Sequence, residues 1–197
     1  MQMDTEFHPF EPWLPADAKM LMCGTFPPPK ARWTMDFYYP NFINDMWRIF
    51  GIIMHSDKNY YVDLANKTFR LDAIKEMLIE HGIALSDTGR EVIRTRGNAS
   101  DKYLEIIKPI DLKGTLEKIP QCFSIVTTGE KAAAVIAEAT GTIVPRTGEK
   151  VTVTIPGTRR QLTHWRMPST SRAYPLPLEK KAEFYRCMLL DCHIISG

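Results

Sequence analysis

The chain has 197 residues, which is near the ordinary size of one domain and enough to bury a core without disulfides or metals. Its 25 basic and 23 acidic residues leave a formal net charge of +2, so any nucleic-acid binding must rest on a local basic patch. The sequence has no long apolar run, and its N-terminus has no basic segment followed by an apolar one. We therefore expect no membrane span, no secretory signal and a cytoplasmic location.

The cysteines and histidines do not form a metal-binding pattern. The chain has 4 cysteines and 5 histidines, which are scattered and include no Cys-x-x-Cys pair. We therefore expect no metal and no other cofactor. In a reducing compartment the cysteines should act as small buried apolar side chains, at Cys23, Cys122, Cys187 and Cys192.

The N-terminal part of the sequence predicts an arm, a strand, a stiff loop and a helix. Residues 1–18 mix prolines with aromatic rings, which predicts an extended arm that packs its rings on the domain. The apolar run 20–23 stops at Gly24, as a buried parallel strand does where it enters a loop. Three prolines at 27–29 stiffen this loop, and apolar residues at three- and four-residue steps over 43–54 predict an amphipathic helix.

The middle of the chain alternates predicted strands and helices. The polar residues 55–69 predict an inserted loop, followed by a helix over 70–81 and a short strand over 83–86. At the exit of that strand, Asp87 can either position a substrate or cap the next turn. Further along we expect an arginine-rich segment (90–100, with Arg90, Arg94 and Arg96), helices over 100–107 (capped by Ser100) and 111–119, a strand over 123–128, and a helix from 130 that ends at Gly141.

The C-terminal part completes the pattern. Residues 150–155 alternate apolar and polar side chains, which predicts a half-exposed strand, and the basic segment 158–167 would form its partner or a central strand. A last helix is expected over 177–191. Because strands and helices alternate, the predicted fold class is α/β, a three-layer α/β/α sandwich with a mainly parallel central sheet, in one domain over 1–197.

Four short motifs occur in a fixed order: GTFPPP (24–29), FYYPNFINDMWRIFG (37–51), GIALSDTG (82–89) and MPSTSRAY (167–174). In this order they resemble the motif series of the uracil-DNA glycosylase superfamily, most closely its mismatch-specific and hypoxanthine-type branches. There a strand ends in Gly-x-x-Pro, a Tyr-Tyr…Asn-x-Phe-Trp segment follows, and a Pro-Ser-Thr-Ser-Pro-Ala segment comes late. The resemblance covers residues 19–189 and implies a uracil-DNA glycosylase-like fold.

The resemblance implies a monofunctional DNA glycosylase of base excision repair, which hydrolyses the N-glycosidic bond of a deaminated base, uracil or hypoxanthine, once the nucleotide has been rotated out of the helix. Flat rings would form the pocket wall, and backbone amides near the strand end would stabilise the departing anion. Many relatives carry Asn or Asp two residues after the glycine, where this chain has Phe26. The expected base-pocket residues are Gly24, Thr25, Phe26, Tyr38, Tyr39, Asp87 and Thr128.

The residue that holds the attacking water is expected in the second motif. Counting from the paired tyrosines to Trp47 places the asparagine of that branch on Asn44, with Asp45 as the second choice. The alternative is that Asn44 only caps the following helix. The late motif would hold the DNA backbone through a rigid turn, and the expected DNA-binding residues are Pro168, Ser169, Thr170, Ser171 and Arg172.

Two other functions stay open from the sequence. One is a non-catalytic DNA-binding or damage-recognition protein of the same fold, and the other is an α/β enzyme that acts on free nucleotides or nucleosides. For the favoured function the partner is DNA with a damaged base, bound by a monomer. The hydroxyls of Thr127 and Thr128, where some relatives have Asn, predict weak discrimination between uracil and hypoxanthine. A local basic surface is expected from Lys30, Arg32, Arg159, Arg160, Arg166 and Arg172.

Overall fold

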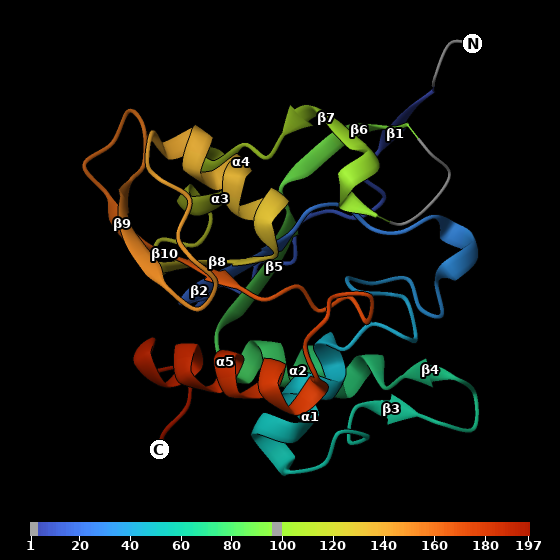
Figure 1. The fold of residues 1–197 in the computed structure, drawn as a ribbon. Coiled ribbons are helices and arrows are strands. Elements are labelled where there is room, and N and C mark those ends of the chain that lie inside the picture. Colours follow the sequence, from blue (N-terminus) through green and yellow to red (C-terminus); the bar gives the residue numbers. More distant parts are fainter. Residues whose placement is uncertain (1–3, 96–99) are drawn as a thin grey trace.

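A five-stranded sheet forms the centre of the computed structural model, which describes residues 4–95 and 100–197 (Figure 1). Its strand order is β5-β2-β8-β10-β9, in which the first four strands run parallel and β9 lies antiparallel at the edge. Strands β2, β5 and β8 are buried along their whole length, as apolar parallel strands are when both faces are covered. The strands span β2 (Met20–Gly24), β5 (Ile83–Asp87), β8 (Ser124–Thr128), β9 (Lys150–Thr154) and β10 (Gln161–Met167).

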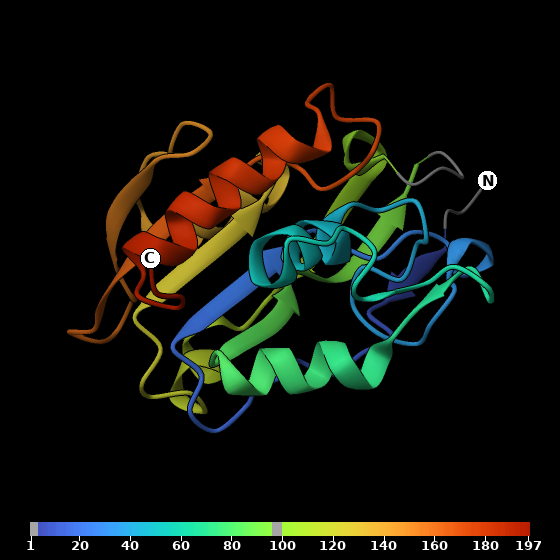
Figure 2. The ribbon, with the colours of Figure 1, turned by 90° about the horizontal axis from the view of Figure 1, so that it is seen from below.

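Helices cover both faces of this sheet, so the predicted three-layer α/β/α architecture is confirmed. The side chains of β2 alternate between two cores: Met20 and Met22 pack under α1, α2 and α5, whereas Leu21 and Cys23 pack under α3 and α4. Figure 2 shows α1, α2 and α5 lying across the near face of the sheet. The helices span α1 (Met46–His55), α2 (Leu71–Glu80), α3 (Leu112–Glu117), α4 (Glu130–Thr140) and α5 (Leu178–Asp191). In the described part of the chain, every helix is too short or too polar to cross a bilayer.

A second, antiparallel sheet of order β1-β6-β7 lies near α4 (Figure 1). It corrects the prediction of a helix over 100–107, because a single 3-10 turn, η2 (Asp101–Tyr103), is followed there by strand β7. Ile106 of β7 pairs with Val92 of β6, so strand pairing of β-branched residues outweighs the local helix signal. Arg96, in the predicted arginine-rich segment, lies outside the described residues. The strands span β1 (Thr5–Phe7), β6 (Gly89–Arg94) and β7 (Leu104–Pro109).

Two smaller predictions also change. The predicted loop 55–69 contains a short hairpin of β3 (Val62–Asp63) and β4 (Thr68–Phe69). Cys187 is exposed, unlike the other three cysteines, because it lies off the buried stripe of α5. The remaining predicted helices and strands are present, with ends that differ by three residues or fewer.

The N-terminal arm runs along the edge of the main sheet. Trp13 and Leu85 exchange two backbone hydrogen bonds of 2.9 Å, which covers the outer edge of β5. The rings of Phe10 and Trp13 pack on the core as predicted, whereas Phe7 is exposed. Next in the chain, the loop after β2 contains the 3-10 turn η1 (Lys30–Arg32).

The parallel strands set the position of the site. Because β2, β5, β8 and β10 run in one direction, their last residues, Gly24, Asp87, Thr128 and Met167, meet at one edge of the sheet. Ligands of open α/β sheets bind outside this carboxyl edge. The segments that follow β2, β8 and β10 therefore start at this edge.

Candidate active site

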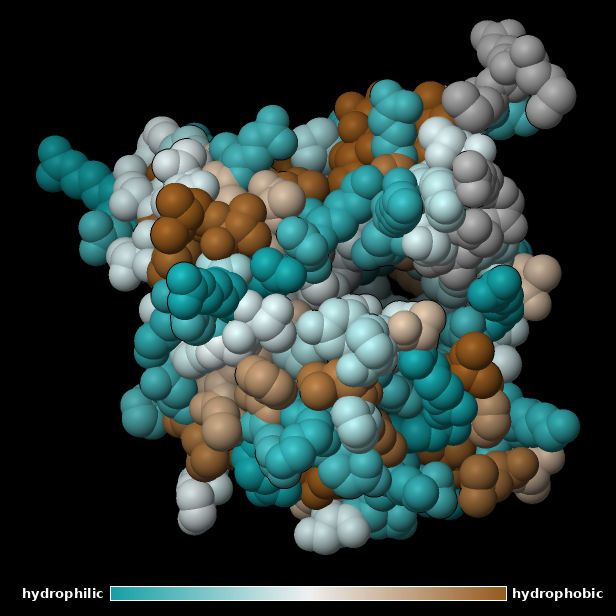
Figure 3. All heavy atoms as spheres, in the orientation of Figure 1, coloured by the Kyte–Doolittle hydropathy of each residue, from teal (hydrophilic) through white to brown (hydrophobic). Residues whose placement is uncertain are grey.

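A small cavity opens at the carboxyl edge of the sheet. It has a volume of about 130 Å³ and is lined by the loop after β2 (24–28), by the turn before α1 (39–41 and Asn44) and by the segment after β10 (169–171). Figure 3 shows this face hollowed above the loop that joins β10 to α5. Three single residues at strand or turn ends complete the lining: Asp87, Asp101 and Thr128.

The floor of the cavity requires a glycine at position 24. A Cβ atom on Gly24 would lie 2.7 Å from Asp87 Oδ1 and 3.3 Å from the Tyr39 hydroxyl, both closer than normal contacts. The Tyr39 hydroxyl lies 3.2 Å from Thr128 Oγ1. Burial raises the pKa of Tyr39 well above its usual value, and the charge of Asp87 adds to this effect. Tyr39 is therefore a neutral phenol that can donate and accept.

The N-terminal arm supplies one side of the cavity. His8 Nε2 lies 2.8 Å from Asp87 Oδ2, and the two side chains are 1% and 8% exposed. An ionised carboxylate only accepts hydrogen bonds, so His8 is the donor. The His8 ring also meets Phe26 edge to face, with the ring centres 5.2 Å apart. The arm thus fixes both Asp87 and Phe26.

Asp101 reaches the same cavity from η2. Thr25 Oγ1 donates a hydrogen bond of 2.7 Å to Asp101 Oδ2. Burial raises the pKa of the Asp101 carboxyl, the hydrogen bond from Thr25 acts against this, and the charge of Asp87 raises the pKa further. Asp101 is therefore protonated more readily than an exposed aspartate.

Asn44 lines the cavity just before α1. Its Oδ1 accepts a 2.9 Å hydrogen bond from Met46 N, which holds the first turn of the helix. Its Nδ2 has no hydrogen-bond partner in the ranges 4–95 and 100–197. The sequence left open whether Asn44 caps the helix or holds a water molecule. Its side chain can do both, because Oδ1 stabilises the start of the helix and the two N–H groups of Nδ2 can donate to a ligand or a water molecule.

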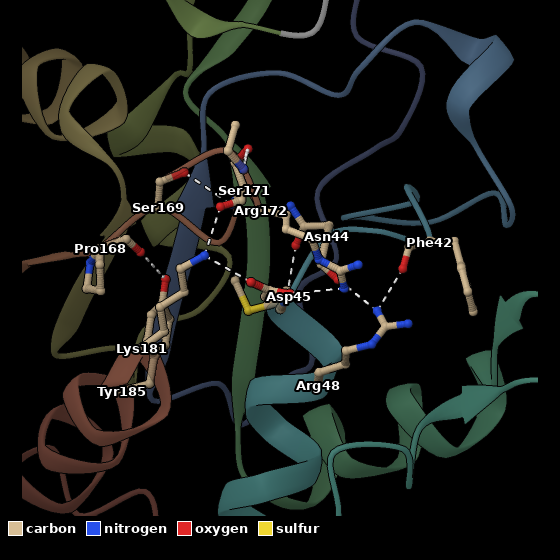
Figure 4. A network of polar contacts seen from close by, with 12 residues as sticks. Phe42, Asn44, Asp45, Arg48, Pro168, Ser169, Ser171, Arg172, Lys181 and Tyr185 are labelled. Atoms are coloured by element: carbon tan, nitrogen blue, oxygen red, sulfur yellow. Dashed lines mark hydrogen bonds and ion pairs between the residues drawn. The ribbon is translucent and has the colours of Figure 1, made fainter. Parts of the chain in front are cut away.

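A buried polar network lies beneath the cavity and joins α1, α5 and the segment after β10 (Figure 4). Lys181 Nζ donates to Asp45 Oδ2 at 2.9 Å and to Ser171 O at 2.8 Å. Asp45 N donates to Thr170 O at 2.9 Å. The Tyr185 hydroxyl donates to Pro168 O, also at 2.9 Å. These contacts hold the 168–171 segment against the start of α1.

A larger groove of about 820 Å³ runs beside the cavity and shares Asp101, Ser169 and Ser171 with it. Glu130 also lines the groove and lies 3.5 Å from Arg166 Nη2. No cluster of three or more His, Cys, Asp or Glu side chains suited to a metal ion occurs among the described residues. The basic side chains that line the groove are Arg32, Lys102, Lys131 and Arg166.

Comparison with solved structures places this geometry in a known fold. A solution NMR structure from Methanosarcina acetivorans, described as a "putative Uracil DNA glycosylase", matches with a TM-score of 0.60 and 18% sequence identity, over 93% of this chain and 96% of that chain. The chain has a uracil-DNA glycosylase-like fold. No protein-family model and no curated protein matches the sequence. The resemblance drawn from the four motifs is thereby confirmed for the fold.

The small cavity gathers most of the residues expected in a base pocket. Tyr38 is the exception, because its ring is buried in the core and its hydroxyl donates to Glu11 O at 3.0 Å. Asp45 and Arg172 line neither the cavity nor the groove, and they contact each other at 3.4 Å. Pro168 lines the groove. The expected residues that do line the cavity are Gly24, Thr25, Phe26, Tyr39, Asn44, Asp87, Thr128, Ser169, Thr170 and Ser171.

The expected basic surface is smaller than the sequence suggested. Strand β10 runs toward the cavity, so Arg159 and Arg160, which precede Gln161, lie at the opposite edge of the sheet. Arg160 is used there to bind backbone carbonyls, including those of Leu116 and Ile119 at 2.6 and 2.9 Å. Of the six expected cations, the groove contains Arg32 and Arg166.

Three residues of the site were not predicted. His8 had no signal, since the histidines are scattered, and Asp101 was assigned to a helix that does not form. Lys181 did have a signal, because it falls at helical spacing with Ala182, Tyr185 and Met188 on the buried stripe of α5. A lysine on an apolar stripe indicates a buried partner.

Proposed function

We propose that this chain is a monofunctional DNA glycosylase that hydrolyses the N-glycosidic bond of a deaminated base, uracil or hypoxanthine, in base excision repair. The observation that carries the proposal is a small cavity that adjoins a basic groove, on a glycosylase-like fold. An engineered cavity of about 150 Å³ in another protein takes up one benzene ring. The present cavity, of about 130 Å³, suits a ligand of the same class, a single base ring.

The cavity can receive a base only after the nucleotide leaves the stack. Phe26 and Tyr39 offer flat apolar surfaces for the ring. Of the two threonines on which weak discrimination was predicted, Thr127 is buried and bonded to His164 and Trp165 O, whereas Thr128 lines the cavity. The hydroxyls of Thr128 and Tyr39 adapt as donors or acceptors, which supports the prediction that uracil and hypoxanthine are discriminated weakly. The damaged base is thus expected to lie between these side chains.

Hydrolysis breaks the bond between C1′ and the base nitrogen, and both electrons of that bond leave with the base. A water oxygen forms the new bond to C1′, and the proton that water releases neutralises the base anion. The amides of Thr25 and Phe26 have no protein acceptor in the described part of the chain, so they are available to the anion. One such donor is worth roughly 3 kcal/mol in the transition state. Asn44 Nδ2 would orient the water.

The groove would carry the DNA backbone next to the cavity. Its four basic side chains supply the local positive surface that a net charge of +2 demands. Ser169 and Ser171 line both spaces, so their polar groups would meet the phosphates on either side of the extruded nucleotide. The buried Lys181 network would hold this segment in place while the strand bends.

A second candidate function has one observation in its favour. Phe26 occupies the place where many relatives carry a catalytic Asn or Asp, and the chain would then be a damage-recognition protein that binds without cleaving. An enzyme acting on free nucleotides is the remaining alternative. Such an enzyme would have no use for a groove as large as the one beside the cavity.

The test is cleavage of oligonucleotides that each carry one uracil, hypoxanthine or other lesion, followed by alkali treatment. We expect strand breaks at uracil, hypoxanthine or both, with intact DNA of the same sequence as the control. Tight binding of damaged DNA without cleavage would support the damage-recognition function. Equal activity on the mononucleotide and on long DNA would support the nucleotide enzyme.

A further inference from the structure

Two carboxyl groups line the same small cavity, and their surroundings differ. Asp87 is paired with His8 at 2.8 Å, whereas Asp101 has no ion-pair partner among the residues that the structure describes. Asp101 Oδ2 accepts a hydrogen bond from Thr25, and Asp101 Oδ1 has no hydrogen-bond partner within the same residues. Unlike surroundings can push the pKa values of two neighbouring carboxyls apart, so that the two groups take different roles.

The charged groups around Asp101 come from several elements. Burial is the largest cause and raises its pKa, as does the charge of Asp87 on β5. Lys131 of α4 and Arg94 of β6 act in the opposite direction without reversing the shift. Lys102, the next residue in the chain, lines the adjoining groove. The net effect favours the protonated carboxyl, which is a hydrogen-bond donor.

We propose that Asp101 is a catalytic residue whose protonated carboxyl donates a hydrogen bond to the departing base, at the carbonyl oxygen or ring nitrogen where negative charge gathers. The proposal rests on the proposed glycosylase function. While the electron pair of the C1′–N bond passes to the base and water bonds to C1′, Asp101 keeps its own proton. The substrate class is therefore a base with a carbonyl group, whose anion such a donor stabilises.

An ionised Asp101 would have the opposite effect. It would place a second negative charge in a cavity that already holds Asp87, and both would repel the base anion. Thr25 fixes the orientation of the carboxyl at the strand exit, where Phe26 supplies no polar group. The Thr25–Asp101 pair therefore places a polar group at this exit of β2.

The test compares single-turnover cleavage by the wild type, Asp101→Asn, Asp101→Ala and the control Asp72→Asn, which changes an exposed carboxylate on α2. The wild-type rate should fall as pH rises through the pKa of Asp101. Asp101→Asn should stay within about tenfold of the wild type and lose this pH dependence, because an amide N–H donates at every pH, whereas Asp101→Ala should lose about a hundredfold. The control should match the wild type.

Two results would overturn the proposal and leave the glycosylase function standing. One is a rate that rises with pH and vanishes in Asp101→Asn, which assigns Asp101 as a general base. The other is an unchanged rate in folded Asp101→Ala. If that variant does not fold, a carbon-13 NMR titration of the carboxyl decides, since a pKa at or below the ordinary value of about 3.9 contradicts a protonated donor. If the wild type cleaves no lesion, both the function and this proposal fail.

Discussion

Lys181 and Asp45 form an ion pair in the interior of the protein. Lys181 Nζ lies 2.9 Å from Asp45 Oδ2, and the two side chains are 1% and 6% exposed. Lys181 belongs to α5 and Asp45 precedes α1, so the pair joins two helices beneath the cavity (Figure 4). Because Lys181 also binds Ser171 O at 2.8 Å, the pair fixes the 168–171 segment relative to Asn44.

The first prediction tests this pair. Lys181→Met should lower the free energy of unfolding by about 3 kcal/mol, because the buried Asp45 then keeps the exposed and more distant Arg172, at 3.4 Å, as its ion-pair partner. The adjacent Lys180→Met is the matched control, since Lys180 is exposed and pairs with Glu183, and it should cost less than about 1 kcal/mol. Urea unfolding measures both. The double variant Asp45→Asn, Lys181→Met should recover part of the stability that Lys181→Met loses. Equal losses of stability in Lys181→Met and in the control Lys180→Met would contradict the prediction.

The sequence was sufficient where burial alone decides the structure. The apolar run 20–23 predicted β2 correctly because a strand buried on both faces has no polar side chains. Asp101 was predicted on a helix because the residues around it have helix-forming character. In the structure, residues 104–109 form a strand instead, because they pair with β6. Long-range pairing of this kind leaves no local signal.

The site was predictable where it follows strand ends and not where it depends on distant partners. Gly24 and Thr128 end parallel strands, so their place in the cavity follows from the fold class. His8 reaches Asp87 across 79 positions of sequence, and neither residue indicates the other. Asp45 was the second catalytic choice because the sequence does not show that it is paired with Lys181, which lies 136 positions away.

A second prediction concerns pH. His164 is fully buried in β10, and burial lowers its pKa to about 4. The single hydroxyl proton of Thr127 is donated to Trp165 O, so in the contact between Thr127 Oγ1 and His164 Nε2 the histidine is the donor. A second proton, on His164 Nδ1, would be buried and would have no acceptor among the described residues. Because the unfolded state takes up this proton near pH 6.5, stability should be lost as pH falls from about 6.5 to about 4, by roughly 3 kcal/mol.

The measurement is urea unfolding of the wild type and of His164→Gln over this pH range. The variant cannot take up the proton, so its stability should change less with pH than that of the wild type. Parallel curves would show that His164 titrates normally in the folded protein.

A third prediction concerns Gly24. The added Cβ in Gly24→Ala would lie 2.7 Å from Asp87 Oδ1, and His8 restricts the retreat of that carboxylate. Overpacking of this kind costs about 1–3 kcal/mol of stability. Cleavage should fall by more than about tenfold, since small displacements of positioned groups have large effects on rate. Affinity for undamaged DNA should not change, because the groove is not altered. A variant with wild-type cleavage would show that the floor of the cavity does not contact the base.

A fourth prediction tests the groove. Lys131→Ala should weaken binding to DNA of any sequence and lower the salt dependence by about one phosphate contact. Arg159→Ala, at the opposite edge of the sheet, is the control and should leave both quantities unchanged. Fluorescence titrations at several salt concentrations measure the two slopes. If the control has the larger effect, DNA binds elsewhere on the protein.

The last prediction separates the two roles of Asn44. Asn44→Ala should lower single-turnover cleavage by about a hundredfold while affinity for damaged DNA stays near that of the wild type, because contact with the attacking water matters mainly in the transition state. It should also cost about 0.5–2 kcal/mol of stability, because Met46 N loses its acceptor. Asn44→Ser keeps an acceptor for Met46 N but lacks the amide donors, so it should regain the stability and not the rate. Rapid-quench kinetics and thermal unfolding on the same samples decide the matter. If the serine variant regains both, Asn44 only holds the start of α1, and the attacking water is positioned by another group of the cavity.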